Sequence, residues 1–225
     1  LAAGGFGTAR IWDTATGAVL ISALGKPDRA VNIIGDEHVL YGTFSPDSRL
    51  AVILMMTRAQ IWDVSTRQPL GPAFETQPGG GYYATFSPDG RWLLVAGSQG
   101  IALWEAATGK KLRHSRYLDK DVVYASFSRD GRYVAIACKD RTARVCESSS
   151  GRPVTPELVH DAPVARAVFS SDGHLLLTAT TEAVRVWDAH SGQPVTTVLK
   201  HPEGLACCEF SADGRCVRTI DNTRA

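Results

Sequence analysis

The chain has 225 residues, of which 44% are hydrophobic and 21% are charged, the composition of an ordinary globular protein. Its formal net charge of +1 excludes the strongly basic surface that nucleic-acid or acidic-membrane binding requires, and no apolar run is long enough to cross a bilayer. The five cysteines are odd in number and include the adjacent Cys207 and Cys208, which argues against a disulfide framework, and the absence of a CxxC motif argues against a zinc site; reduced thiols in a cytoplasmic protein are expected.

The first segment, residues 1–24, contains TARIWDTATG, in which an apolar stretch ends at Trp12 and Asp13 and a polar turn follows. Similar stretches follow along the chain as AQIWDVSTRQ, IALWEAATG, TARVCESSSG and VRVWDAHSG. A second marker is a Phe-Ser pair that enters a turn containing Asp. It starts at Phe44, Phe86, Phe127, Phe169 and Phe210, at spacings of 42, 41, 42 and 41 residues. Two markers that share one period indicate an internal repeat.

The repeat divides one region, 1–225, into units. Complete units are expected at 39–74, 81–117, 122–159 and 164–200, and partial units at 1–24 and 205–225. Residues 25–38 form an insertion, because the chain from Trp12 to Phe44 is longer than the equivalent connections. Such an insertion is consistent both with a binding loop and with a solvated loop that has no partner.

Four strands are expected within the unit 81–117. Tyr82–Phe86 leads into an Asp-Gly turn, and Trp92–Ala96 is apolar throughout, as in a strand covered on both faces. Ile101–Trp104 follows, and a more polar strand is expected at Lys111–Tyr117. Short strands that grade from apolar to polar are typical of a propeller blade whose first strand is innermost. Because one unit cannot cover both faces of its own sheet, the units must stack, and the fold class is all-β.

With these markers the chain resembles the WD-repeat β-propeller family over essentially its whole length. The Trp-Asp pair is literal in three repeats and becomes Trp104–Glu105 and Cys146–Glu147 in two others. The repeat positions are held by Trp12, Asp13, Trp62, Asp63, Trp104, Asp140, Cys146, His160, Trp187, Asp188 and His201. The resemblance implies about five four-stranded blades. The terminal strands favour an incomplete section of a ring of six to eight blades over a closed five-bladed ring.

In this family, His, Asp, Ser or Thr, and Trp side chains form a hydrogen-bonded network in each blade. No complete unit here combines the His, the Asp and the Trp, so we expect the network to be lost, because a partly satisfied polar network is worse than an apolar one. The unit 122–159 has Leu118 at the His position and Cys146 at the Trp position. Since a reactive thiol needs exposure and nearby positive charge, we interpret Cys146 as a buried structural position.

Sequence patterns of catalysis are not found in the chain. There is no glycine-rich loop that leads into a helix, no HExxH motif and no kinase HRD or DFG motif, and we expect no cofactor and no metal. We therefore predict a non-catalytic scaffold that binds a protein or peptide, and not a nucleic acid or a membrane. Two alternatives stay open. One is the regulatory region of a serine/threonine kinase whose catalytic domain lies outside this sequence, and the other is an enzymatic propeller with a site in its central funnel.

The style of the units is similar to WD-repeat arrays in large bacterial multidomain proteins, which implies a region of a cytoplasmic signalling protein. We expect binding on the face that carries the loops before the innermost strands and the loops between second and third strands. The candidates, chosen as long, polar or aromatic side chains at loop tips, are Gln77, Tyr82, Lys120, Lys139, Arg141, Asp161, Arg166 and Glu203. The basic stretch 110–120 is consistent with an acidic-partner patch and with a charged edge strand.

Overall fold

The structure is a computed structural model, and it describes residues 2–4, 8–24, 39–55, 57–76, 81–112 and 120–221. In these ranges all regular elements are β-strands, and the paired strands run antiparallel. The strands belong to two compact units, Leu1–Ser115 and Arg116–Ala225. The described residues include no long apolar helix that could cross a membrane. The predicted all-β fold class, built from four-stranded antiparallel sheets, is confirmed.

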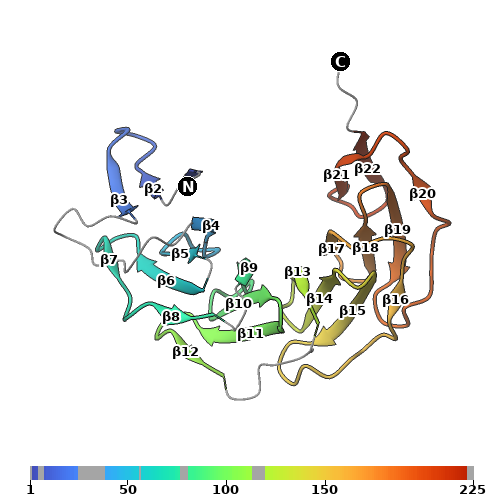
Figure 1. The fold of residues 1–225 in the computed structure, drawn as a ribbon, viewed down its shortest axis with the longest axis horizontal. Coiled ribbons are helices and arrows are strands. Elements are labelled where there is room, and N and C mark those ends of the chain that lie inside the picture. The colour runs from blue at the N-terminus through green and yellow to red at the C-terminus, as the bar shows by residue number, and fades with distance from the viewer. Residues whose placement is uncertain are drawn as a thin grey trace. The chain divides into compact units, whose positions relative to one another are not determined.

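The first unit contains three sheets, drawn in blue to green in Figure 1. The first sheet contains β1 (Ala2–Gly4), β2 (Thr8–Trp12) and β3 (Val19–Leu24). The second contains β4 (Val39–Phe44), β5 (Leu50–Met55), β6 (Arg58–Asp63) and β7 (Gln68–Pro69), and β8 (Phe74–Glu75) also pairs with β6. The third contains β9 (Gly81–Phe86), β10 (Trp92–Gly97), β11 (Gly100–Glu105) and β12 (Lys110–Lys111). Apart from β8, which pairs with β6, the strands of each sheet follow the chain order.

The second unit repeats this order in two four-stranded sheets and a hairpin. One sheet contains β13 (Val122–Phe127), β14 (Tyr133–Cys138), β15 (Thr142–Glu147) and β16 (Leu158–Val159). The next contains β17 (Arg166–Phe169), β18 (Leu175–Ala179), β19 (Ala183–Asp188) and β20 (Leu199–Lys200). The hairpin pairs β21 (Leu205–Phe210) with β22 (Val217–Asp221). The strand order within these sheets is the one expected of propeller blades.

The outermost strands are shorter than the sequence suggested. The fourth strand of the third sheet was expected at Lys111–Tyr117, whereas β12 covers Lys110–Lys111, Leu112 follows it outside the strand, and residues 113–119 lie outside the described residues. The side chains of β12 are exposed, so a longer strand there would gain little from burial.

The insertion 25–38 and Gln77 also lie outside the described residues.

The Phe-Ser marker is a hairpin turn closed by its own side chains. Between β13 and β14, Ser128 Oγ donates to Asp130 Oδ1 at 2.6 Å, and the N–H of Tyr133 donates to Ser128 Oγ at 3.0 Å. Gly131 takes a φ of 72°, a conformation that a residue with a Cβ adopts only with strain. The same Ser–Asp bond closes the turns that begin at Ser45, Ser87, Ser170 and Ser211. The turn is therefore a local device repeated with the period of the sequence.

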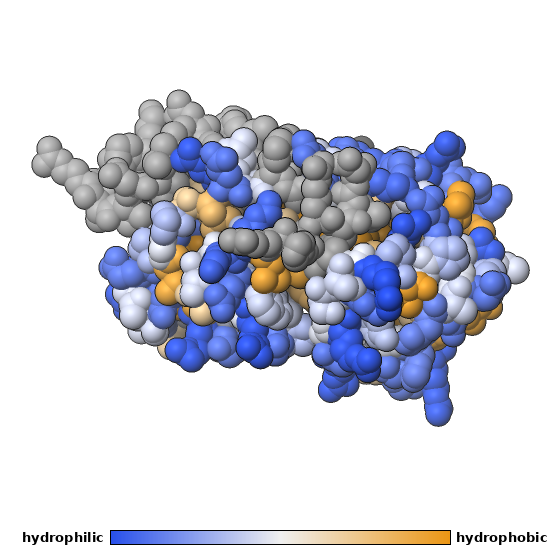
Figure 2. All heavy atoms as spheres, turned by 90° about the horizontal axis from the view of Figure 1, so that it is seen from below, coloured by the Kyte–Doolittle hydropathy of each residue, from blue (hydrophilic) through white to orange (hydrophobic). Residues whose placement is uncertain are grey.

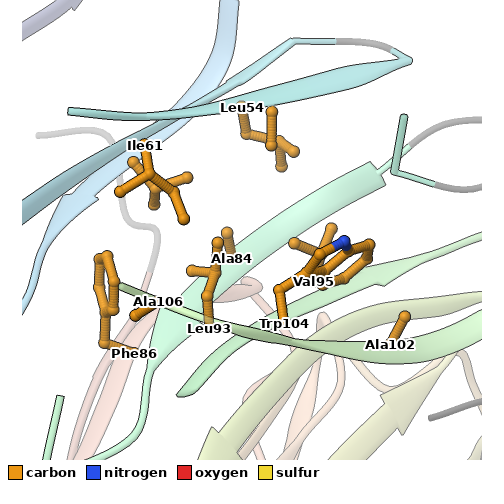
Figure 3. Packing of buried hydrophobic residues seen from close by; sticks show 11 residues of the cluster. Leu54, Ile61, Ala84, Phe86, Leu93, Val95, Ala102, Trp104 and Ala106 are labelled. Carbon is orange, nitrogen blue, oxygen red and sulfur yellow. The ribbon is translucent and has the colours of Figure 1, made fainter. Parts of the chain in front are cut away.

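The main core of the first unit lies between the second and third sheets. In Figure 3, Leu54 and Ile61 of the second sheet face Leu93, Val95 and Trp104 of the third. The residues of β10 after its first position are all buried, although successive side chains of a strand point to opposite faces of the sheet. Burial on both faces explains why the second strands β5, β10 and β14 are almost entirely apolar.

The core of the second unit joins small side chains of one sheet to large ones of the next. Ala135, Ala137 and Ala143 of the β13–β16 sheet share a buried cluster with Leu176 and Trp187 of the β17–β20 sheet. Small residues leave room for the indole ring between the sheets.

The division of the chain into repeat units and the incomplete ring of six to eight blades stay predictions.

Candidate functional site

Five loops of the second unit lie at one end of its sheets. Backbone bonds connect them: the N–H of Lys139 donates to the carbonyl of Asp121 at 2.9 Å, and that of Val164 donates to Cys138 at 3.1 Å. The N–H of Leu205 likewise donates to the carbonyl of Thr181 at 2.7 Å. We refer to residues 120–121, 139–141, 160–165, 180–182 and 201–204 as the loop face. These bonds fix the loops to the sheets, so the loop face is held in place by the scaffold.

Most of the candidate binding residues lie on or beside the loop face. These are Lys120, Lys139, Arg141, Asp161, Arg166 and Glu203. Tyr82 belongs to the first unit, where it is half-buried in β9, and Gln77 lies outside the described residues. Arg166 is exposed at the start of β17, with its guanidinium carbon 5.8 Å from the centre of the Tyr124 ring. Six of the eight candidates therefore belong to the second unit, and Tyr82 belongs to the first.

Lys120 is largely occupied within the chain. Its Nζ lies 2.7 Å from Asp140 Oδ2 and 2.7 Å from Glu157 Oε1, and it donates to Thr142 Oγ1 at 3.2 Å. Burial opposes the charge of Lys120, but its hydrogen bonds to Asp140 and Glu157 hold the pKa of the amine above its ordinary value. The same lysine hydrogen bond holds the pKa of Glu157 below its ordinary value. We infer that Lys120 joins the loop face to the outer strand of its own sheet.

The expectation that the family's polar network is lost was wrong for the β17–β20 sheet. His160 Nδ1 lies 2.9 Å from the carbonyl of Leu158, which can only accept, so this nitrogen carries the proton of the neutral ring. His160 Nε2 then accepts from Thr178 Oγ1 at 2.8 Å, and Trp187 Nε1 donates to the same hydroxyl at 2.8 Å. Burial lowers the pKa of His160, which keeps the ring neutral. Thr178 lets three members form a satisfied network without an Asp at position 181.

The other repeat positions have diverged. Trp62 is 1% exposed and its Nε1 has no hydrogen-bond partner among the described residues, whereas Trp12 is 43% exposed. Trp104 stacks with Phe74, at a ring-centre distance of 5.1 Å. His201 Nδ1 lies against the carboxylate of Asp221. A Trp in the repeat pattern thus indicates a strand position, and it does not by itself indicate a polar network.

The Asp that follows the Trp has one constant role. Asp63 Oδ1 accepts from the N–H groups of Ser65 and Thr66 at 2.8 and 2.9 Å. The equivalent oxygens of Asp13 and Asp188 accept from the two corresponding turn amides. Hydrogen bonds hold the pKa of each of the three carboxyls below its ordinary value, chiefly from the turn amides at Asp13 and Asp188 and from the Ser65 hydroxyl at Asp63. The Trp-Asp pair is therefore a strand end followed by a turn cap.

Cys146 lies in the interior of its sheet. It is 1% exposed, between its antiparallel partners Val134 and Pro153. Burial raises the pKa of the thiol to about 11, although the charge of Arg144 acts in the opposite direction. The position agrees with the interpretation of Cys146 as buried, and its lack of reactivity stays a prediction.

A hollow on the loop face was not foreseen from the sequence. It has a volume of about 250 Å³ and lies beside β19 and β20, where Arg185, Val198 and Lys200 contribute to its walls together with His160 and Asp161. No group of three or more His, Cys, Asp or Glu residues in the described ranges is placed to hold a metal ion. In the view of Figure 2, the coloured surface is mainly hydrophilic and its hydrophobic side chains form separate small areas. Recognition on such a surface would depend on individual polar groups.

Two stretches of the second half of the chain match a known family model. Residues 111–147 and 154–188 each match the model described as "WD domain, G-beta repeat". The matches cover β13–β15 and β16–β19 and together make up about a third of the chain. No curated protein matches the chain.

Proposed function

We propose, on the premise that the chain contains two WD repeats, that it is a non-catalytic scaffold that binds a protein or peptide. WD-repeat domains are generally protein-interaction scaffolds and are usually non-catalytic. The observation that carries the proposal is the loop face, on which exposed charged side chains stand on loops bonded to the sheets. Binding to such a face costs little conformational entropy, because the loops are ordered before the partner arrives.

The charges on the loop face support a polar mode of recognition. Lys139, Arg141, Asp161 and Glu203 are exposed there, and both signs are represented. Arg166 adds a guanidinium beside an aromatic ring, a combination that is enriched at the centres of interfaces. Two of the five thiols are disfavoured as nucleophiles, because burial raises the pKa values of Cys138 and Cys146 to about 11.

We further propose that the chain belongs to a cytoplasmic bacterial signalling protein, and the alternative is the regulatory region of a serine/threonine kinase. The five cysteines are all free, and unpaired cysteines are typical of reducing compartments. The bacterial and kinase parts rest on the resemblance of the repeats alone.

The scaffold function is tested by mapping a bound partner. Proteins captured by the chain are cross-linked through lysines, and we expect cross-links to Lys139 and Lys200. Arg166→Ala should weaken capture about tenfold, because it removes a guanidinium from the loop face. The matched control is Arg152→Ala, an exposed arginine paired with Glu147 in the turn after β15. If Arg152→Ala weakened capture and Arg166→Ala did not, the loop face would be the wrong surface.

A further inference from the structure

The hollow on the loop face lies where the preceding sheet has a cluster of charged side chains. In the β13–β16 sheet, Ala143 pairs with Leu158 in the ladder, and in the β17–β20 sheet Val184 pairs with Leu199. The two ladders therefore have the same register, offset by 41 residues. With this offset, the strand position of Arg144 corresponds to that of Arg185, and the position of Glu157 to that of Val198.

The charged cluster of the first of these sheets includes a carboxylate for its arginine. Arg144 Nη2 lies 3.1 Å from Glu157 Oε1, and Lys120 Nζ binds the same carboxylate at 2.7 Å. In the next sheet the outer strand offers Val198 instead, and Ala162 lies in the loop that corresponds to that of Lys120. The hollow of about 250 Å³ occurs at this place, because shorter side chains replace the ion-pair cluster.

Arg185 is left without a counter-ion inside the hollow. Its guanidinium carbon lies 4.4 Å from the centre of the Trp187 ring, and it makes no ion pair with the described residues, including the exposed rim residues Asp161 and Glu182. Its Nε is buried without a hydrogen-bond partner in the described part of the chain, as is that of Arg144. Stacking on the indole fixes the plane of the guanidinium and leaves its N–H groups free to bind a planar anion.

The rim of the hollow is partly apolar. Val159 is 64% exposed and Val198 39% exposed, both on outer-strand segments that line the hollow. Exposed aliphatic side chains beside the half-buried Arg185 match a ligand with a carboxylate next to aliphatic groups. An acidic residue in an extended peptide has this chemistry.

We propose that the hollow binds an acidic side chain of a partner peptide, whose carboxylate pairs with Arg185 as Glu157 pairs with Arg144, while aliphatic neighbours contact Val159 and Val198. This inference rests on the proposed scaffold function and gives it a specific site. The partner supplies in trans the carboxylate that the preceding sheet supplies from its own outer strand.

The test uses two peptides that differ in one charge, N-acetyl-Val-Glu-Val-amide and N-acetyl-Val-Gln-Val-amide. Binding to the chain is followed by the ¹⁵N resonance of the Arg185 Nε–H group, assigned by its loss in Arg185→Lys. The glutamate peptide should shift this resonance saturably, and the glutamine peptide should bind about tenfold more weakly, because a charge-assisted hydrogen bond is lost. Equal responses to the two peptides would overturn the proposal.

Two matched variants test the site itself. Val198→Glu places a carboxylate where the preceding sheet has Glu157, so it should shift the Arg185 resonance without peptide and abolish the response to the glutamate peptide. Val195→Glu adds the same charge at a 56% exposed valine that does not line the hollow, and it should bind like the unchanged chain. An unaltered peptide response in Val198→Glu would overturn the site.

The two proposals fail in different ways. If Val198→Glu still captured a cross-linked partner and the glutamate peptide gave no response, the hollow would be the wrong site and the scaffold function would stand. If no partner were cross-linked to the loop face in any variant, the scaffold function would fail with it.

Discussion

The different burial of two cysteines predicts different reactivities of their thiols. Cys146 is 1% exposed and Cys216 is exposed, so the two thiols of one chain provide an internal comparison. We predict that a thiol reagent labels Cys216 rapidly in the native chain and leaves Cys146 protected, as read by mass spectrometry of the digested protein. Labelling of Cys146 at the rate of Cys216 would show that it is a reactive site.

The same thiol predicts a pH dependence. The folded chain holds the Cys146 proton up to a pKa of about 11, whereas an unfolded thiol releases it near the ordinary value of 9.0. Between these values the folded state binds more protons than the unfolded state, so the free energy of unfolding should fall as the pH rises from 9 to 11. In Cys146→Ser, whose hydroxyl does not titrate there, the fall measured by urea unfolding should be smaller.

Thr178 is the residue on which the network of the β17–β20 sheet depends. It is 0% exposed, and its hydroxyl bonds both His160 and Trp187. Thr178→Val keeps the shape but leaves two buried ring nitrogens without a partner, which should cost about 2–3 kcal/mol in urea unfolding. The control, Thr178→Ser, keeps the hydroxyl and loses one methyl group, so it should cost only about 1 kcal/mol. Equal losses in the two variants would mean that the hydrogen bonds do not stabilise the sheet.

At the scale of the element, the turns between first and second strands differ at one position. Ser48 has a φ of 59° in the β4–β5 turn, where the equivalent turns have glycines such as Gly131 at 72°. A side chain in this left-handed region is strained, because its Cβ crowds the backbone.

We predict that Ser48→Gly raises the free energy of unfolding by about 1 kcal/mol, because it relieves this strain. The reverse substitution at an equivalent position, Gly131→Ser, should lower the free energy of unfolding by a similar amount, and both variants are measured by thermal or urea unfolding. A destabilising Ser48→Gly would show that the Ser48 side chain contributes more than its backbone strain costs.

At the scale of the whole molecule, the four-stranded sheets divide their burial in a similar way among their strands. The second strands β5, β10 and β14 are buried after their first residue, whereas the two-residue strands β12 and β20 are exposed. Amide protection follows burial and ladder position, because exchange requires local opening.

We therefore predict that hydrogen exchange, followed by mass spectrometry, is slowest in the second strand of each four-stranded sheet and fastest in the outer strands. The pattern should recur with the period of about 42 residues that the Phe-Ser marker shows. Slower exchange in β20 than in β18 would contradict it.

Much of the scaffold could be predicted because its signals are local. The Ser and Asp of each turn bond within five residues, as between Ser128 and Tyr133, so their spacing alone predicts a hairpin. Strand order followed from the repeat. The length of the outer strands could not be predicted in the same way, because it depends on how far the neighbouring strand buries their side chains.

The sequence by itself determined the all-β sheets, because their turns and strands depend on neighbours along the chain, and it predicted the repeat units and the candidate binding residues from a fixed period. Only the tertiary structure decided which side chains have partners within the chain. Lys120 is occupied by Asp140 and Glu157, Thr178 completes the network of His160, and Arg185 pairs with no carboxylate in the described part of the chain. These outcomes depend on side chains that lie some 10 to 40 residues apart in the chain and meet only when the sheets are in register, and an electrostatic or hydrogen-bonding contact acts over a few ångströms.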